Sequence, residues 1–185
     1  MGGVDSLKGS LLLATPALFD PNFRRTVVLI GEHGEEGAMG LVLNRPSEVT
    51  VGEAVPPLAP VAGDEALVYV GGPVQPDAVL VLAEFDEPGS SATLVVGDIG
   101  FASSEGDLEM LAGATRRARV FAGYAGWAPG QLEAELEEES WLVEPAGGVD
   151  LFPTPGEDLF GVILRGKGGT TNRLLALMPE DPSQN

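Results

Sequence analysis

Apolar residues along the chain are concentrated in short runs, many rich in Val, Ile and Leu, which glycine, proline and polar residues separate. Runs of this length and composition predict β-strands. The predicted strands are Ser10–Ala14, Thr26–Ile30, Met39–Leu43, Ala66–Val70, Ala78–Ala83, Ala92–Val96, Arg119–Tyr124, Trp141–Val143 and Arg173–Leu177. The second and third flank a polar, glycine-containing loop, which predicts a hairpin with a loop longer than two residues. The fourth and fifth flank a Gly-Gly-Pro turn and predict another strand pair.

Helical signals are fewer and lie between these runs. They occur in Val51–Leu58, Ser103–Gly113, Pro129–Glu139 and Thr154–Leu164. Two consecutive prolines limit the first segment to one or two turns, and the last begins with a capping box. In the third segment, Leu132 and Leu136 lie one turn apart on the predicted buried side. Five glutamates fill much of the remainder, which predicts a solvated face.

The order of these elements predicts the fold class. Strands come first and helices follow irregularly, without the alternation that a doubly wound parallel sheet needs. We therefore predict an α+β fold. A chain of 185 residues with 44% hydrophobic residues can build one ordinary core. Residues 1–185 are predicted to form a single domain, with flexible ends at 1–8 and 179–185.

The charge of the chain is strongly negative. Acidic side chains outnumber basic ones by 28 to 10, which gives a formal net charge of -18. The averaged field repels phosphate backbones and anionic lipid, so we expect no membrane partner and no direct nucleic-acid binding. The arginines that could form a local basic face are Arg24, Arg25, Arg116, Arg117 and Arg119. We expect these arginines to pair with surrounding carboxylates.

Cysteine is absent, which excludes disulfides, thiolate metal sites and a cysteine nucleophile. The apolar run Leu11–Phe19 is interrupted by Pro16 and has no basic leader, so it predicts neither a signal peptide nor a spanning helix. We therefore expect a cytoplasmic protein.

Candidate chemistry is sparse. His33 is the single histidine; it could serve as a general base, because imidazole titrates near neutral pH, or it could bond a carbonyl at a strand end. No acidic run has the spacing of a calcium loop, and no serine has the flanking glycines of a nucleophile elbow. We expect no metal and no cofactor.

A second informative segment brings two large aromatic residues to one turn. Tyr124 and Trp127 alternate with Gly123 and Gly126 ahead of a predicted helix. Glycine permits positive φ or close backbone approach, and the aromatic rings have large amphipathic surfaces. The turn could hold a ligand or could be a packed corner of the fold.

Five segments closely resemble the YqgE/AlgH family. They are Leu11–His33, Gly37–Pro46, Val68–Val74, Gly123–Leu136 and Asp150–Leu164. They span nearly the whole chain in the expected order. The resemblance implies a compact α+β domain with a branched, mixed, mainly antiparallel sheet that curls toward a partial barrel, with helices on its outside. It also implies a cytosolic bacterial protein of a family named as transcriptional regulators, a name that comes with no established biochemical activity.

Two functional hypotheses follow. The first is a noncatalytic regulatory or interaction module whose exposed motif loops bind a protein or a small ligand. The alternative is a hydrolase-like enzyme in which His33 acts as general base beside Glu32. The candidate binding surface comprises Asn22, Arg24, Arg25, Glu32, His33, Asn44, Arg45, Gly71, Gly72, Tyr124, Trp127 and Gln131. Catalytic and metal-binding residues are not predicted under the first hypothesis.

Overall fold

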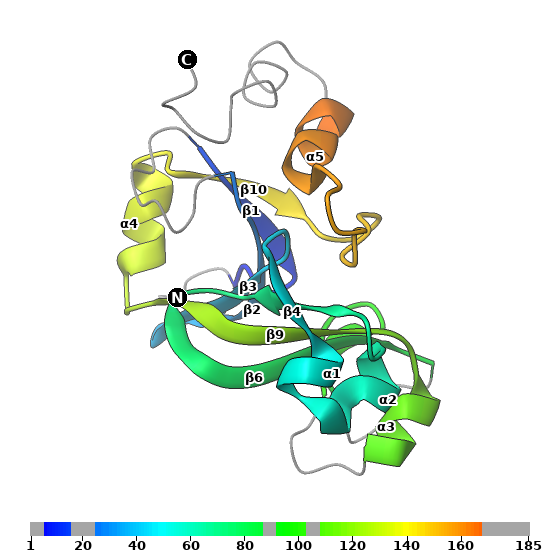
Figure 1. Ribbon diagram of the computed structural model, residues 1–185. Coiled ribbons are helices and arrows are strands. Elements are labelled where there is room, and N and C mark those ends of the chain that lie inside the picture. Colours follow the sequence, from blue (N-terminus) through cyan, green and yellow to red (C-terminus); the bar gives the residue numbers. More distant parts are fainter. Residues whose placement is uncertain (1–5, 16–24, 87–91, 103–107, 168–185) are drawn as a thin grey trace.

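The computed structural model describes residues 6–15, 25–86, 92–102 and 108–167 (Figure 1). Its strands are β1 (Ser10–Ala14), β2 (Val27–Gly34), β3 (Gly37–Val42), β4 (Pro46–Thr50), β5 (Leu67–Val70), β6 (Val74–Phe85), β7 (Ala92–Val96), β8 (Ile99–Ala102), β9 (Thr115–Trp127) and β10 (Trp141–Pro145). Its helices are α1 (Val51–Ala54), the 3-10 helix η2 (Pro56–Leu58), α2 (Ala59–Ala62), α3 (Leu108–Ala114), α4 (Gln131–Glu137) and α5 (Leu159–Lys167). None of the helices in these ranges is long and apolar enough to cross a membrane.

The strands form one sheet that branches at β9. The main order is β10-β1-β2-β3-β9-β6-β8-β7, and β4 pairs with β5 off this path. One side of β9 pairs with β6, while its other side pairs with β5 near Phe121 and with β3 near Trp127. Among the described strands every pairing is antiparallel except that of β5 with β9. The predicted α+β fold with a branched, mainly antiparallel sheet is confirmed.

The sheet curls, so that strands far apart in its order come into contact. A Cβ atom added to Gly9, just before β1, would lie 2.9 Å from the carbonyl oxygen of Val95 on β7. One added to Gly31 on β2 would lie 2.7 Å from the ring of Phe101 on β8. The β7–β8 end of the sheet therefore packs against the β1–β2 end without closing the hydrogen-bonded ring. This arrangement is the predicted partial barrel.

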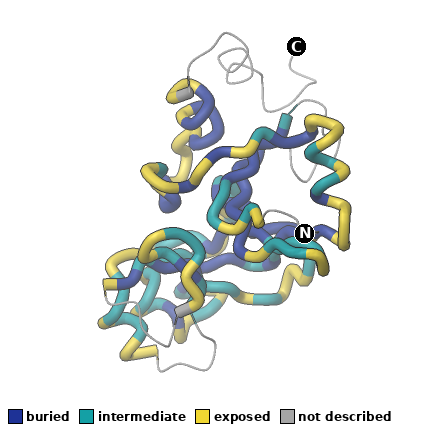
Figure 2. The backbone as a smooth tube through the Cα atoms, turned by 180° about the vertical axis from the view of Figure 1, so that it is seen from behind, coloured by how far each residue is buried: buried dark blue, intermediate teal, exposed yellow. Residues whose placement is uncertain are grey.

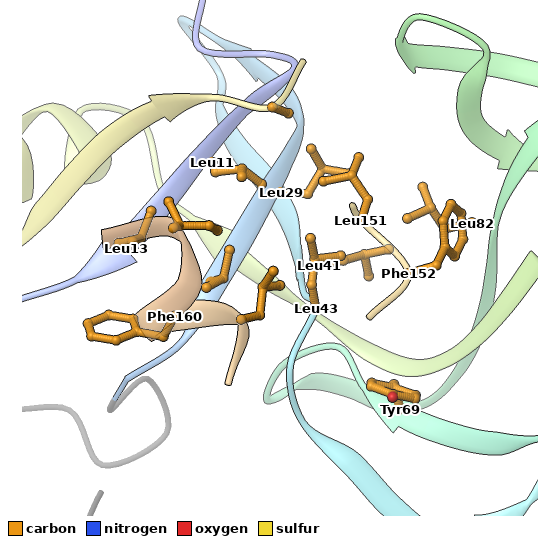
Figure 3. Close-up of a cluster of buried hydrophobic side chains, with 14 of the residues drawn as sticks. Leu11, Leu13, Leu29, Leu41, Leu43, Tyr69, Leu82, Leu151, Phe152 and Phe160 are labelled. Atoms are coloured by element: carbon orange, nitrogen blue, oxygen red, sulfur yellow. The ribbon is translucent and has the colours of Figure 1, made fainter. Parts of the chain in front are cut away.

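The first three strands are buried on both faces. Leu11 and Leu13 point into one core cluster, whereas Leu12 and Ala14 point into a second cluster on the opposite face, as the two-residue period of a strand requires. Figure 3 shows the first cluster, in which Leu11 and its neighbours from β2 and β3 meet side chains of the segment before and within α5. Burial on both faces explains why these strands read as continuous apolar runs.

The helices cover different parts of the sheet (Figure 1). Helix α5 packs on the first cluster through Phe160 and Leu164, and α4 packs on the second through Leu132. Helices α1 and α2 lie over a third, smaller cluster that includes Val51 and Val120. Figure 2 shows buried residues concentrated in the strands, whereas the helices carry many exposed and half-buried residues. The helices therefore lie outside the curled sheet, as predicted.

The C-terminal helix begins later than the capping box predicted. The box itself forms, because the backbone N–H of Thr154 donates to the Glu157 carboxylate over 3.2 Å. The chain then turns through Gly156, whose φ is 92°, a conformation that interrupts a helix. Helix α5 starts at Leu159, and Asp158 accepts a hydrogen bond from the N–H of Gly161 over 3.0 Å. The helix cap is therefore Asp158.

Several other elements differ from the sequence predictions. Strands β4 and β8 were not predicted, and β5 does not pair with β6, because β9 lies between them. At the N-terminal end, the N–H of Leu7 is hydrogen-bonded to His33; the flexibility of residues 1–8 stays a prediction. The predicted caps at Ser103 and Ser104, the strand Arg173–Leu177 and residues 179–185 lie outside the described residues.

Candidate functional site

His33 lies at the end of β2 with both ring nitrogens occupied. The backbone N–H of Leu7 donates to Nδ1 over 2.9 Å, and Nε2 lies 2.6 Å from Oε1 of Glu133 on α4. The His33 side chain is 1% exposed. A backbone N–H cannot accept, so Nδ1 is unprotonated and Nε2 carries the proton that it donates to Glu133. The ring is therefore neutral and has no free lone pair.

The carboxylate paired with His33 is that of Glu133 and not that of the adjacent Glu32, whose residue is exposed. The hydrogen bond from His33 is the main reason that the pKa of Glu133 is lowered, because hydrogen bonds to the charged form stabilise it. A general base needs an accessible lone pair within reach of a substrate. In this arrangement His33 has none.

Glu135, on the same helix, joins the two tryptophans of the chain. Its Oε1 accepts hydrogen bonds from Nε1 of Trp127 over 3.1 Å and from Nε1 of Trp141 over 2.9 Å. Its Oε2 accepts from Nε2 of Gln131 over 3.0 Å. The two indole rings meet edge to face with their centroids 6.0 Å apart. The predicted turn around Trp127 is a packed corner.

These contacts correct the prediction that the glutamates of α4 form a solvated face. Glu133 binds the end of β2, and Glu135 binds the ends of β9 and β10. Glu137, Glu138 and Glu139 are exposed. Sequence reasoning missed both contacts. The partner of Glu133 lies on a strand that is distant in the chain, and the partners of Glu135 lie on strands that a turn separates from the helix.

Asn44 lies at the opposite end of β2. Its Oδ1 accepts from the N–H of Val27 over 3.0 Å, and its Nδ2 donates to the carbonyl of Arg25 over 2.9 Å. Arg25 has a left-handed backbone with a φ of 51° and forms an ion pair with Asp158 at 3.0 Å. Its guanidinium lies 4.7 Å from the ring centroid of Phe160. Asn44 and Arg25 thus fasten the start of β2 and the start of α5.

Gly71 and Gly72 lie where β5, β3 and β9 pass close to one another. The N–H of Gly71 donates to Ala122, and its carbonyl accepts from Val42 over 2.8 Å. A side chain at Gly72 would collide with the backbone of Tyr124. The carbonyl of Arg45 accepts from the N–H of Val70 over 2.8 Å. Gly71 and Gly72 therefore have to be glycine, because the neighbouring backbone leaves no room for a side chain.

The predicted surface therefore separates into three groups. His33, Trp127 and Gln131 gather around α4, the paired glycines and Tyr124 lie at the strand crossing, and Arg25, Asn44 and Arg45 lie toward the other end of β2. Val27 and His33 are six residues apart on β2, which corresponds to about 20 Å. Asn22 and Arg24 lie outside the described residues. The described motif residues do not converge on one cleft.

The arginines at the start of β9 are paired, as expected. Arg116 lies 3.1 Å from Asp86 and 3.3 Å from Asp98. Arg117 lies 3.1 Å from Glu84 and 2.9 Å from Asp150. Glu84 also contacts Arg116 at 3.4 Å. These ion pairs are exposed and together form a network on one edge of the sheet.

Arg119 is the exception. Its guanidinium lies 4.2 Å from the ring centroid of Tyr69 and 5.9 Å from that of Phe152, which is cation–π geometry. Burial lowers the pKa of Arg119, and burial raises the pKa of Tyr69. Nη1 of Arg119 is buried without a hydrogen-bond partner among the described residues. Arg119 is a half-buried cation packed against two rings of the first core cluster.

An apolar groove lies between α3 and the sheet. Its volume is about 420 Å³, and its lining residues are Leu58, Val79, Leu80, Val81, Phe101, Ala102, Leu108 and Leu111. Val79 is 48% exposed, and Met110 on α3 is 74% exposed. None of the seven residues of α3 is buried. Sequence reasoning missed this groove, because its lining residues come from four separate elements and no local pattern brings them together.

A smaller polar hollow of about 280 Å³ lies beside the arginine network, between Arg116, Arg117 and the loop containing Gly147 and Gly148. Its charged walls already pair with one another. Within the described part of the chain, no group of three or more His, Cys, Asp or Glu residues is arranged to hold a metal ion.

Similarity to known proteins is extensive. A family model described as AlgH-like matches residues 11–172. A UPF0301 protein of Streptomyces coelicolor is 46% identical over 194 aligned residues, covering 100% of this chain and 98% of that protein. A UPF0301 protein of Mycobacterium tuberculosis is 41% identical over 182 residues, covering 96% of this chain and 90% of that protein.

Two solved structures resemble this one. The crystal structure of protein DIP2367 from Corynebacterium diphtheriae has a TM-score of 0.82 and 29% identity, and it covers 96% of this chain and 95% of that one. The solution structure of the AlgH protein from Pseudomonas aeruginosa has a TM-score of 0.72 and 35% identity, with coverage of 97% and 98%. On the match of the family model and of full-length relatives, this chain belongs to the AlgH-like family.

Proposed function

We propose that this protein is a noncatalytic protein-binding module, and that the groove between α3 and the sheet receives an apolar segment of another protein. The observation that carries the proposal is the groove itself. Eight apolar residues line it, and large apolar side chains at its rim remain in water. Contiguous apolar surface on a protein commonly marks an interaction site.

The energetics of the groove favour occupation. Burial of apolar surface stabilises a complex by about 25 cal/mol per Å², and the lining residues Val79 and Leu108 have exposed area to contribute. Helix α3 touches its neighbours without burying a residue of its own. A segment bound in the groove would bury those apolar side chains of α3 that line it. Apolar surface that is exposed in the free protein would therefore be buried in the complex, which favours binding.

The polar motif residues support a noncatalytic role by what they already do. Both nitrogens of His33 are bonded within the protein, and the carboxylates of Glu133 and Glu135 hold α4. Asn44 fastens the start of β2. These motif residues hold the fold together. The hydrolase-like alternative would require His33 to release Nδ1 from the N–H of Leu7, because Nδ1 carries the only lone pair of the ring.

A second copy of this chain is a poor occupant. Each copy has a formal net charge of -18, so two copies repel as they approach. The occupant that we propose is therefore a different protein.

The test is selection of a displayed random-peptide library on the purified protein. We expect enriched peptides whose affinity falls at least tenfold, or about 1.4 kcal/mol, in the variant Val79→Asn. Val143→Asn is the matched control, because Val143 is a comparably exposed strand valine, 39% exposed, on distant β10. Circular dichroism establishes that both variants are folded. Absence of enrichment, or equal binding by Val79→Asn, would overturn the proposal.

Catalysis is tested separately by profiling wild type on broad panels of hydrolase substrates. We expect turnover at background level. Turnover by wild type that is lost in folded His33→Gln and Glu133→Gln would instead establish the enzyme.

A further inference from the structure

We infer that the segment bound in the groove is amphipathic, with apolar side chains on the side that enters the groove and lysines or arginines on the other. The inference rests on the proposed function and specifies the chemistry of the partner. It follows from the distribution of charge around the groove.

Every element that lines the groove belongs to a part of the chain without a single cation. Positions 46–115 contain twelve acidic residues and no lysine, arginine or histidine. This stretch includes η2, β6, β8 and α3, which supply the lining residues. All ten basic side chains of the protein lie before or after it. The apolar groove is thus built from a region of one charge sign.

Exposed carboxylates stand beside the lining residues. Asp77 lies two residues before Val79 on β6 and is exposed. Glu109 lies between Leu108 and Met110 on α3 and is also exposed. A partner whose apolar side chains contact Val79 and Leu108 would bring its flanking residues close to these carboxylates. Basic flanks would be attracted there, and acidic flanks would be repelled.

The nearest cations in the sequence do not offset this field. Arg116 and Arg117 directly follow α3, but their guanidinium groups contact Glu84, Asp86, Asp98 and Asp150. Each arginine thus faces at least two carboxylates. Four carboxylates and two arginines give this network a net negative charge. The electrostatic potential around the groove therefore stays negative.

The two kinds of contact have different roles. Apolar side chains supply most of the affinity, whereas complementary charge raises the association rate and fixes orientation. A helix that presents apolar residues at i, i+3, i+4 and i+7 suits a groove between a helix and a sheet. An acidic or lipid-like occupant would gain the same apolar contacts but would be repelled by the rim. A basic amphipathic segment is therefore the favoured occupant.

The experiment compares three synthetic helices of about 18 residues, long enough to span about 27 Å. One has leucines at helical spacing and lysines elsewhere, the second has glutamate for lysine, and the third is a scrambled form of the first with the same composition. Each carries a fluorophore, and fluorescence anisotropy reports binding to the full chain. We expect the lysine helix to bind at least tenfold more tightly than the other two, and less tightly as salt is raised.

Variants locate the binding and separate its two components. Val79→Asn should weaken the lysine helix at least tenfold, whereas Val143→Asn should leave it unchanged. Asp77→Asn combined with Glu109→Gln should weaken it severalfold, whereas Glu137→Gln on distant α4 should not. Equal binding of the lysine helix and its scrambled form would show nonspecific attraction and overturn the inference.

The outcomes also distinguish the two proposals. Preference for the glutamate helix, with loss of binding in Val79→Asn, would overturn the inference about charge and leave the groove as a protein-binding site. Failure of all three helices, together with failure of the library selection, would overturn the proposed function itself.

Discussion

At the scale of single residues, two glutamates on one helix hold the corner between β2, β9 and β10. Glu133 accepts from His33, and Glu135 accepts from Trp127 and Trp141. All three donors belong to side chains that are largely buried. Hydrogen bonds to a charged acceptor contribute more than neutral ones. Helix α4 is short, so these contacts and Leu132 determine its position.

Glu135→Ala removes the acceptor that both indole N–H groups share. Because each of the two buried donors that lose their partner costs about 1–3 kcal/mol, we expect the free energy of unfolding to fall by about 2–6 kcal/mol. Urea unfolding followed by tryptophan emission measures the change, since both tryptophans of the chain report on this corner. Glu137→Ala, on the exposed side of the same helix, is the control and should change stability by less than about 0.5 kcal/mol. Equal unfolding midpoints for the two variants would contradict the account.

Glu133 makes part of the stability dependent on pH. Its pKa in the folded protein lies below the ordinary value of 4.5, mainly because of the hydrogen bond from His33. The unfolded chain therefore binds more protons at this group, so its contribution rises with pH. The stabilisation is present above the unfolded-state pKa and is lost as pH falls through the lower folded-state pKa.

The corresponding measurement compares wild type with Glu133→Gln by urea unfolding at several pH values. We expect wild type to be more stable at about pH 7, with the difference shrinking toward about pH 3 as the carboxylate is protonated. Glu137→Gln should show no such convergence, because that carboxylate is exposed. A difference between wild type and Glu133→Gln that is constant with pH would disprove the role of the charge.

The sequence predicted which residue types would be found at this corner but not their contacts. His33 and Glu133 are 100 residues apart, and no local pattern joins a strand end to a helix that distant. Glu135 lies among four other glutamates, and helical periodicity alone placed it on a solvated face. For Trp127 the sequence left two alternatives, a ligand-holding turn and a packed corner, because glycine and aromatic residues in one short segment are compatible with both.

At the scale of elements, predictability follows burial. Strands β1 to β3 were predicted because they are apolar on both faces and their runs are continuous. Strand β4 has a proline and exposed polar residues, and β8 is four residues long with a glycine, so neither has a local strand signal. The start of α5 was misplaced because the positive φ of Gly156 is a conformational choice that a capping box does not reveal.

The contact between β2 and β8 tests how the curled sheet is held. Gly31→Ala would place a methyl group 2.7 Å from the Phe101 ring and 3.3 Å from the sulfur of Met39. Overpacking of this kind costs about 1–3 kcal/mol, so we expect the melting temperature to fall by several degrees. Gly34→Ala on the same strand is the matched control, because its added Cβ would meet nothing within 4 Å. Calorimetry measures the melting temperature of both variants. Equal melting temperatures would mean that β8 can shift away from the added methyl group without loss of stability.

At the scale of the whole molecule, charge and apolar surface divide the protein into two regions. The side of the molecule that includes α4 and α5 has motif side chains bonded within the fold and the two-sided core of β1 to β3. The region of α1 to α3 has a smaller core, an open apolar groove and no cation between positions 46 and 115. We therefore propose that the binding function belongs to the region in which the fold leaves apolar surface exposed.

The net charge of -18 has a consequence for the free protein. Like charges repel most in the compact state, so the folded form is destabilised relative to the unfolded one at low ionic strength. Raising salt from about 10 mM to about 150 mM shortens the screening length from about 30 Å to about 8 Å, which weakens this long-range repulsion more than it weakens short ion pairs such as Arg117 with Asp150 at 2.9 Å. We expect the melting temperature to rise by a few degrees, equally in NaCl and KCl, because screening depends on ionic strength. A fall in melting temperature would mean that the arginine ion pairs outweigh the repulsion among the surplus carboxylates.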